Sequence, residues 1–306
     1  MSLRVDESQR RLLQDAAQAE RPFLWGLAFR ITGVAADAED VVQETLTRLL
    51  QQPPADLSAP LRPWLVRVAS RLAIDVLRRR RRTHYVGPWL PSPVADDAPG
   101  SPTARYEARE SLTFAFLLAL EALPPTQRAI LVLRDVLDLD VRATAAALGQ
   151  SESNVKVSHL RARRRLKDYD PQRVDTSATA QARVQDALLR LLTAIAQHDI
   201  QAVSALLSDQ VVMYSDAGGQ YLSARKPVRG NRSVSLFLVK VQRFSGSVAY
   251  VPSLTQRAGL PALVAQAQEA PPARLAPRFV LGIQLDASGH ICALYNVLAD
   301  RKLATI

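Results

Sequence analysis

The chain has 306 residues, enough for about two or three domains, and its 48% hydrophobic content is typical of a globular protein rather than a disordered one. One cysteine, Cys292, excludes an internal disulfide and a cysteine-based zinc site, and four scattered histidines lack metal-ligand spacing, so we expect no metal or other cofactor. The net charge of +10 predicts a polyanionic partner without distinguishing DNA from RNA or acidic lipid.

The N-terminal region predicts helices and no targeting segment. It lacks the apolar core and cleavage site of a secretory signal, and the longest apolar run, Leu112 to Leu120, is shorter than a bilayer span of about 18 residues. We therefore expect a cytoplasmic protein with no membrane partner. Apolar residues recur at the helical period around Leu24 and again around Val41. Residues 1–82 are predicted to form an all-helical domain.

A third helix in this domain is predicted to begin near Pro63 and to end in five consecutive arginines. Its predicted inward face consists of Leu65, Val68, Leu72 and Val76. The following residues, 83–105, are rich in proline and glycine and are predicted to be a linker, because proline removes a backbone donor and fixes φ.

Helical periodicity resumes over residues 106–170, which predicts a second helical domain. Its helices are expected at Tyr106–Leu123, Pro124–Val136, Val141–Leu148 and Ser151–Tyr169. A short polar linker at residues 171–178 ends this domain.

Residues 179–306 differ in character and predict an α+β domain. Two helices are expected at Ala180–Gln197 and Asp199–Leu207, and strands at Val211–Tyr214, Ser247–Val251, Phe279–Leu285 and His290–Leu298. The turn residues Asp286–Gly289 predict that the last two strands form a hairpin.

The segment from Val141 to Tyr169 has helix-turn-helix spacing. Gly149 supplies a left-handed residue at the turn, and Ser151 is placed to cap the second helix. The predicted inward stripe of that helix is Val155, His159, Ala162 and Leu166. The other faces carry side chains that can bind phosphates or base edges, namely Asn154, Lys156, Ser158, Arg161, Arg164 and Arg165. The alternative is a plain helical hairpin with a solvated basic face.

A second basic concentration lies between residues 60 and 85, with eight arginines against one acid, Asp75. Trp64 stands among them, and an aromatic side chain beside basic ones can stack on exposed bases while arginines hold the phosphate backbone. The arginines can equally be a solvated helix end, and Trp64 a core residue. Before this helix, acidic residues from Asp37 to Glu44 open an amphipathic helix, where negative charge also stabilises the helix dipole.

Residues 38–44 (AEDVVQE), Trp64-Leu65, 73–78 (AIDVLR) and 123–129 (LPPTQRA) resemble, in order and spacing, the extracytoplasmic-function (ECF) sigma factors of RNA polymerase. The resemblance implies two all-α sigma domains: region 2, which binds the β′ clamp of core RNA polymerase and melts the minus-10 element, and region 4, which contacts the β flap and reads the minus-35 element of promoter DNA. The chain departs from the family at Ala143-Thr144-Ala145, where Glu-Ile-Ala is usual.

Carried over by position, the resemblance assigns three sets of residues. The clamp would be met by Asp37, Asp40, Gln43 and Glu44. The minus-10 DNA would be met by Trp64, Arg67, Arg71, Arg78 and Arg79. The basic face of the helix after Ser151 would meet the minus-35 DNA.

The remaining sequence resembles a sigma subgroup with a fused C-terminal SnoaL-like domain, shaped like the nuclear transport factor 2 cone. Residues 89–93 (WLPSP), 216–220 (DAGGQ) and 299–303 (ADRKL) resemble its Trp-Leu-Pro-Glu-Pro, Asp-Gly-Gly-Gly-Lys and Asn-Pro-Asp-Lys-Leu motifs. The resemblance implies a fused regulator that replaces a separate anti-sigma factor. Its expected contact residues are Trp89, Leu90, Pro91, Pro93, Asp216, Gly218, Gly219, Lys302 and Leu303.

Other functions are weaker interpretations. A SnoaL-like cone can bind an unknown small ligand or act as an enzyme, for which Asp216 and His198 are the available bases. We do not expect catalysis, because Asp216 adjoins glycines of a turn and His198 ends a helix. A simple helix-turn-helix repressor would have no need of the arginine-rich helix with Trp64 or of the acidic helix.

Overall fold

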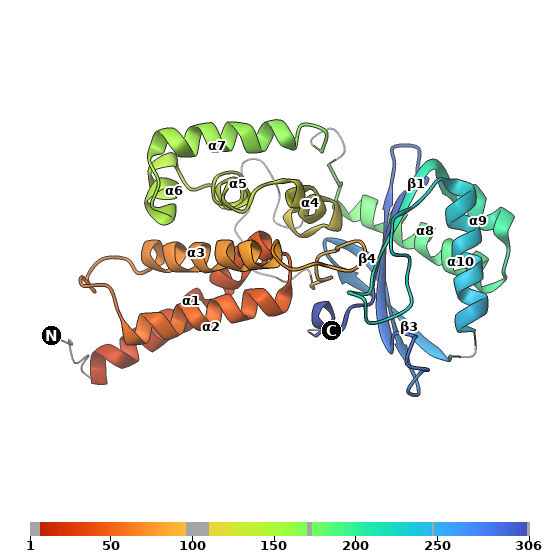
Figure 1. Cartoon of the computed structure of the whole chain (residues 1–306), viewed down its shortest axis with the longest axis horizontal. Coiled ribbons are helices and arrows are strands. Elements are labelled where there is room, and N and C mark those ends of the chain that lie inside the picture. The colour runs from red at the N-terminus through yellow and green to blue at the C-terminus, as the bar shows by residue number, and fades with distance from the viewer. Residues whose placement is uncertain (1–6, 96–109, 170–172, 247, 305–306) are drawn as a thin grey trace. The chain divides into compact units, whose positions relative to one another are not determined.

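The computed structural model describes residues 7–95, 110–169, 173–246 and 248–304 (Figure 1). Parts of the predicted linkers at 83–105 and 171–178, the predicted helix start at Tyr106 and the predicted strand start at Ser247 lie outside the described residues. The chain divides into two compact units. The first comprises residues 1–83, 97–111 and 116–173, and the second comprises residues 84–96, 112–115 and 174–306.

Three long helices open the first unit, as predicted. They are α1 (Glu7–Thr32), α2 (Ala35–Gln51) and α3 (Arg62–Arg80). Gly33 makes the turn between α1 and α2 at a φ of 75°, and its N–H donates to the carbonyl of Phe29 at 2.6 Å. The apolar stripes around Leu24 and Val41 are buried between the helices. No helix in the described part of the chain is long and apolar enough to cross a bilayer.

Shorter helices follow along the chain. They are α4 (Phe114–Ala119), α5 (Pro125–Leu131), α6 (Val141–Leu148) and α7 (Glu152–Arg165), with 3₁₀ turns at Glu110–Leu112 and Leu120–Ala122. The single helix predicted over Pro124–Val136 is instead α5 followed by a π-helical turn at Val132–Val136.

The predicted inward face of α3 was wrong by part of a turn. Only Leu65 of that set is buried, whereas Val68, Leu72 and Val76 are half-buried. The buried side chains are Leu65, Val66, Ala69, Ser70, Ala73, Ile74 and Leu77. The reason is that α3 contacts α1 and α2 and also α5 and α6, so neighbours on more than one side cover it. Sequence periodicity describes a helix with one buried stripe.

The second unit is built on a six-stranded sheet, with the strand order β2-β1-β6-β5-β4-β3. The strands are β1 (Leu207–Asp216), β2 (Val228–Arg229), β3 (Tyr250–Arg257), β4 (Leu260–Ala267), β5 (Arg278–Leu285) and β6 (Ile291–Val297). Strands β1 and β6 are parallel, and the other neighbours are antiparallel.

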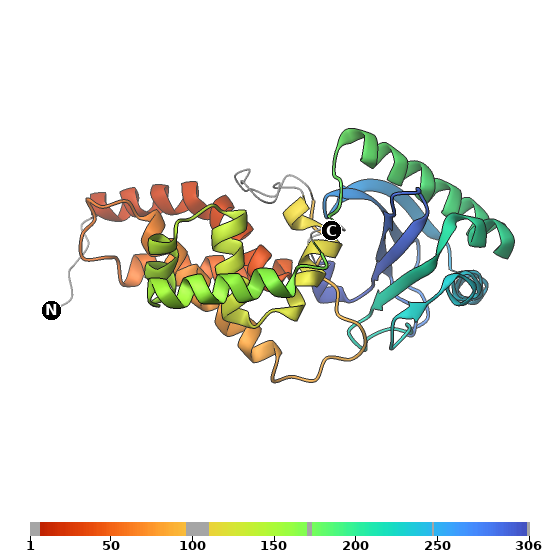
Figure 2. The same ribbon diagram turned by 90° about the horizontal axis from the view of Figure 1, so that it is seen from above.

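Three helices of this unit contact the sheet, and their arrangement is visible in two views (Figures 1 and 2). They are α8 (Ala178–Ala196), α9 (Ile200–Leu206) and α10 (Asn231–Ser245). Helix α8 contacts β4 and β5, and α10 contacts β1. Side chains such as Leu188, Val234 and Leu294 form the core between these helices and the sheet.

The sequence predicted β1, β5 and β6, and it predicted the hairpin turn at Asp286–Gly289, where the N–H of Asp286 donates to the carbonyl of His290 at 2.9 Å. The strand predicted at Ser247–Val251 was placed too early, because β3 begins at Tyr250. The sequence missed α10, whose valines and serines have low helix propensity, and β4, which contains a proline.

Candidate functional site

The helix-turn-helix is formed by α6, a turn at Gly149 and α7, as predicted. Gly149 has a φ of 65°, and the hydroxyl of Ser151 accepts a hydrogen bond from the N–H of Asn154 at 3.2 Å. Val155 and Ala162 are buried beneath α7. His159 holds α7 to the π-helical turn at Val132–Val136, since its Nε2 lies 2.7 Å from Oδ1 of Asp135 in that turn.

The outer faces of α7 carry the predicted DNA-binding side chains. Asn154, Lys156, Arg161, Arg164 and Arg165 are exposed, and Ser158 is half-exposed. Asn154 is held in a short polar ladder, because its Nδ2 donates to Gln150 Oε1 at 3.1 Å and its Oδ1 accepts from Ser158 Oγ at 3.4 Å. The sequence analysis missed exposed Arg163, which lies on the same helix. This surface offers cations for phosphates and a positioned amide for a base edge.

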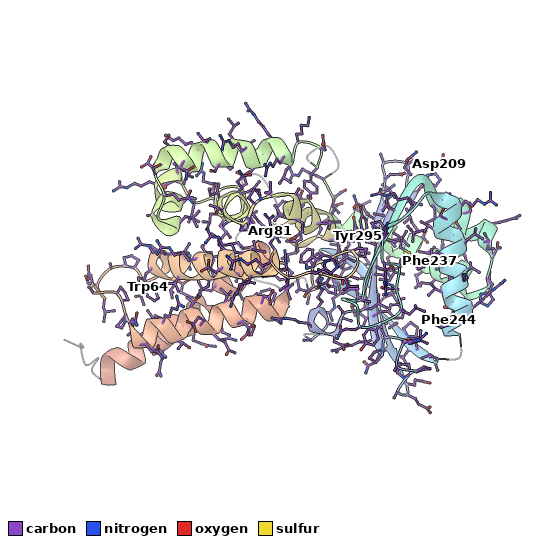
Figure 3. All side chains as sticks on the ribbon, in the orientation of Figure 1. Trp64, Arg81, Asp209, Phe237, Phe244 and Tyr295 are labelled. Atoms are coloured by element: carbon purple, nitrogen blue, oxygen red, sulfur yellow. The ribbon has the colours of Figure 1, made fainter. Side chains whose placement is uncertain are left out.

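The predicted minus-10 residues lie along α3. Arg67, Arg71, Arg78 and Arg79 are exposed and Trp64 is half-buried (Figure 3). Arg78 pairs with Asp75 at 3.1 Å on an exposed face. The guanidinium of Arg71 lies against the helix-turn-helix, since a Cβ atom on Gly149 would be 2.6 Å from its Nη2. A side chain assigned to the minus-10 element therefore adjoins the turn of the helix-turn-helix.

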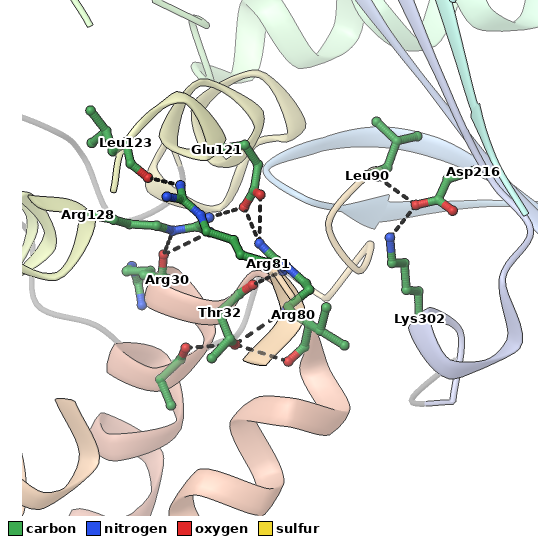
Figure 4. Close-up of polar contacts among 12 residues, drawn as sticks. Arg30, Thr32, Arg80, Arg81, Leu90, Glu121, Leu123, Arg128, Asp216 and Lys302 are labelled. Atoms are coloured by element: carbon green, nitrogen blue, oxygen red, sulfur yellow. Dashed lines mark hydrogen bonds and ion pairs between the residues drawn. The ribbon is translucent and has the colours of Figure 1, made fainter. Parts of the chain in front are cut away.

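The arginines at the end of α3 divide into two groups. Arg78, Arg79, Arg81 and Arg82 are exposed and Arg80 is half-buried. Arg80 and Arg81 reach the segment before α5 (Figure 4). The Arg80 guanidinium donates to both carboxylate oxygens of Glu121, at 2.6 and 2.7 Å. Arg81 donates to the carbonyl oxygen of Leu123 at 2.5 Å. Part of the basic run thus holds the end of α3 to the segment before α5, a role that neither interpretation of the sequence had predicted.

Glu121 also pairs with Arg128, whose side chain is only 1% exposed. Burial alone would raise the pKa of Glu121, but the charges of Arg128 and Arg80 outweigh it and hold that pKa below its ordinary value. Burial lowers the pKa of Arg128 to about 10, so the guanidinium stays charged at neutral pH. No local pattern predicts this cluster, because Arg80 and Glu121 are 41 positions apart in the chain.

The four predicted polymerase-binding residues do not share one environment. Asp40, Gln43 and Glu44 are exposed on α2, but Asp37 is only 9% exposed. Glu44 pairs with Arg48 at 2.7 Å, one helical turn later. Three of the four residues are therefore available on the exposed surface of α2.

The predicted regulatory residues meet within the second unit, around Asp216 at the end of β1. The Asp216 side chain is fully buried and accepts hydrogen bonds from the Tyr85 hydroxyl at 2.5 Å and from the N–H of Leu90 at 2.6 Å. The Nζ of Lys302 pairs with the same carboxylate (Figure 4) and lies 4.5 Å from the centre of the Trp89 ring. We call residues 84–95 the strap, because these contacts bind them to the C-terminal sheet.

The strap is held along its length. At its far end the carbonyl of Val94 accepts from the N–H of Ala258 at 2.8 Å. Gly219, at a φ of 80°, lies against Val86, and a Cβ atom there would be 3.2 Å from the valine. The other predicted members are buried or close to these contacts, namely Pro91, Pro93, Gly218 and Leu303. Tyr85 was missed by the sequence analysis, because it lies outside the quoted motif.

The residues named for catalysis have other surroundings. The Asp216 carboxylate is fully engaged by Lys302, Tyr85 and the strap backbone, and His198 is exposed at the end of α8 with a φ of 56°. Burial raises the pKa of Cys292 to about 11, so its thiol stays protonated. Among the residues that the structure describes, no cluster of histidine, cysteine or acidic side chains could hold a metal ion.

Comparison with known proteins gives two family matches, Sigma-70 region 2 over residues 16–83 and Sigma-70, region 4 over residues 113–166. The ECF RNA polymerase sigma factor SigJ of Mycobacterium tuberculosis is 33% identical over 297 residues, covering 93% of this chain and 91% of that protein. The sigma factor SigG of the same species is 34% identical over 206 residues, covering 60% of this chain and 56% of SigG.

One solved structure agrees with this assignment. The crystal structure of M. tuberculosis SigJ matches with a TM-score of 0.68 and 27% identity, covering 94% of this chain and 96% of SigJ. A SnoaL-like protein from Burkholderia thailandensis matches 38% of this chain and 94% of its own, at 15% identity and a TM-score of 0.28. The chain therefore belongs to the extracytoplasmic-function RNA polymerase sigma factors, with helical regions 2 and 4 followed by a C-terminal α+β domain.

Proposed function

We propose that the C-terminal domain of this sigma factor regulates transcription initiation by holding the strap. The buried Asp216 site carries the proposal, because it binds the residues that directly follow region 2. The strap is part of the chain that joins region 2 to region 4. A domain that binds the strap shortens the free connection between the two DNA-binding regions. It therefore limits the distances between minus-10 and minus-35 elements that the two regions can span.

Promoter recognition is divided between two helices in this proposal. The α3 side chains Trp64, Arg67, Arg78 and Arg79 contact the minus-10 element, and Arg71 joins them when it leaves the Gly149 turn. The exposed face of α7 reads the minus-35 element through Asn154 and its neighbouring cations. Core RNA polymerase binds region 2 through the exposed residues of α2, and also region 4 through its β flap.

A fused regulator makes a separate anti-sigma factor unnecessary, and the protein acts in the cytoplasm, where polymerase and promoters are. Its activity is not enzymatic, as in the sigma factor family at large. Purification of the protein from its own cells, followed by identification of its partners, should recover core polymerase and no stoichiometric inhibitor. A stoichiometric inhibitory protein would refute this part of the proposal.

Regulation is tested with Asp216→Asn in the full chain. The substitution removes the charge that Lys302 pairs with, so we expect the strap to be released more often. The matched control is Asp186→Asn, which changes an exposed aspartate of the same domain that pairs with Arg190 at 3.7 Å.

Both variants are assembled with core polymerase, and run-off transcription is measured on genomic DNA of the source organism with transcripts mapped by sequencing. We expect Asp216→Asn to change transcript yield at least threefold at the same start sites, with core affinity unchanged and Asp186→Asn like the wild type. Equal yields from all three proteins would refute regulation by strap attachment.

A further inference from the structure

A cavity of about 390 Å³ lies in the second unit, between the sheet and helices α8 and α10. Its walls include Leu192 and Ile195 from α8, Phe237 from α10 and Leu281 from β5. Figure 3 labels Phe237 on α10. The volume is within the range of about 300–1,000 Å³ that is usual for small-molecule sites. The cavity is therefore large enough for an organic ligand.

The wall of this cavity is apolar and uncharged. Most lining residues are aliphatic or aromatic, and none of those that the structure describes is Asp, Glu, Lys, Arg or His. Tyr250 stays neutral as well, because burial raises the pKa of its hydroxyl, which donates to the carbonyl of Ala276 at 2.8 Å. A charged ligand would lose its hydration here without gaining a counter-charge, so the wall selects against anions and cations.

Two polar atoms of the lining have no hydrogen-bond partner within the described chain. They are Oγ of Ser215, on a side chain that is 2% exposed, and Oδ1 of Asn296. The two residues are direct partners in the parallel pairing of β1 with β6, and both line the cavity. A buried acceptor without a partner costs about 1–3 kcal/mol, so a donor at this point of the cavity would be stabilised.

We propose that the cavity binds an uncharged, mainly hydrocarbon molecule that carries one hydroxyl or N–H group. The hydrocarbon part packs among the leucines, Phe237 and Phe279, and the polar group donates a hydrogen bond to Oδ1 of Asn296. A hydroxyl on the ligand also accepts a hydrogen bond from Ser215. This site does not depend on the regulation proposed above, because binding can be measured directly on the full chain without polymerase or promoter.

The position of the site also links it to the strap. Ser215 directly precedes Asp216, and Leu298, another lining residue, donates its N–H to the carbonyl of Asp216 at 2.7 Å. A ligand that moves the ends of β1 and β6 would also move the Asp216 carboxylate, which holds the strap. This consequence rests on the proposed function, whereas the site itself does not.

The test uses N-phenyl-1-naphthylamine, an uncharged fluorophore that has one N–H donor and brightens in apolar surroundings. Titration into the full chain should give saturable fluorescence with a stoichiometry of one. Ala265→Phe places a ring inside the cavity, since Ala265 lines it and is 2% exposed, and should weaken binding at least tenfold. Phe244→Ser alters a 59% exposed side chain on the same helix as Phe237 that is not among the lining residues, and should leave binding unchanged.

The polar contact is tested with Asn296→Leu, which keeps the branched shape and removes the acceptor. It should weaken binding of the N–H probe about threefold to tenfold, the usual worth of one hydrogen bond. The N-methylated analogue of the probe cannot donate, so Asn296→Leu should bind it at least as tightly as the wild type does. If Ala265→Phe does not fold, the comparison of these two probes on Asn296→Leu still tests whether the ligand binds in this cavity.

Three outcomes would overturn the proposal. They are the absence of saturable binding to the folded wild type, unchanged binding to a folded Ala265→Phe, and equal weakening of both probes by Asn296→Leu. A negative result would leave the Asp216→Asn transcription experiment intact, because that experiment does not use the cavity.

Discussion

Replacing Glu121 by glutamine should loosen the contact between regions 2 and 4 in the free sigma factor. The substitution keeps the shape of the side chain and removes its charge, which leaves Arg128 buried at 1% exposure without a carboxylate partner. Arg128 also donates to the carbonyl oxygen of Arg30 from Nε and Nη2, but both of these contacts are long at 3.5 Å. Breaking a buried ion pair from one side costs about 3–5 kcal/mol. Glu121 is 28% exposed, so water can reach the site, and we expect about 3 kcal/mol.

Hydrogen–deuterium exchange measured by mass spectrometry can detect this change locally. A loss of about 3 kcal/mol corresponds to roughly 10²-fold faster exchange of amides that exchange through opening of the cluster. The effect should appear in peptides at the end of α3 and the start of α5. The matched control, Glu44→Gln, breaks an exposed pair with Arg48 and should change local stability by no more than about 0.5 kcal/mol.

The double variant Glu121→Gln with Arg128→Met separates loss of a contact from burial of an unpaired charge. Since methionine leaves no charge behind, the double variant should recover part of the protection that Glu121→Gln loses. Two results would refute the reasoning. One is exchange in Glu121→Gln no faster than in Glu44→Gln, and the other is a double variant less protected than Glu121→Gln alone.

Three further predictions concern the same unit. Lys156→Ala should weaken holoenzyme binding to minus-35 DNA about equally on all sequences and reduce the steepness of log affinity against log salt concentration by about 1. Asn154→Ala should instead reduce the binding free energy by about 1–3 kcal/mol on the cognate sequence only. Gly149→Ala places a Cβ atom at a φ of 65°, a backbone conformation that L side chains rarely adopt, so urea titration should show a loss of about 1 kcal/mol. The pKa of Glu121 is lower in the folded protein than in the unfolded chain, so its stabilisation is complete above its ordinary pKa and is lost as the pH falls through the folded value. The urea midpoint of the wild type should therefore fall more steeply below about pH 5 than that of Glu121→Gln, and parallel curves would contradict the assignment.

The helix-turn-helix could be predicted because its signals are local. A left-handed glycine, a capping serine and an apolar stripe all lie within one short segment, and the structure places Gly149, Ser151 and Val155 in those roles. The run of five arginines could not be sorted in the same way. Arg80 and Arg79 are adjacent in sequence, yet one binds Glu121 and the other is exposed. Their difference depends on a carboxylate 41 positions away, which no local pattern contains.

The strap shows a second limit of sequence analysis. Resemblance to family motifs grouped Leu90, Asp216 and Lys302, and the structure brings the three together. It did not predict that Leu90 takes part through its backbone N–H, because every residue except proline has that donor and the side chain gives no sign of it. It also missed Tyr85, whose hydroxyl is another neutral donor to Asp216.

The departures from the family motifs are themselves informative once the fold is known. Gln220 replaces the lysine of one motif, and Asp300 replaces the proline of another, 80 positions later. In the structure Gln220 donates to the Asp300 carboxylate at 3.2 Å and accepts from the N–H of Asp300 at 3.0 Å. Tyr221 donates to the same carboxylate at 2.8 Å. Two substitutions that look independent in sequence thus form one contact beside the Asp216 site, and they hold the segment after β1 to the segment after β6.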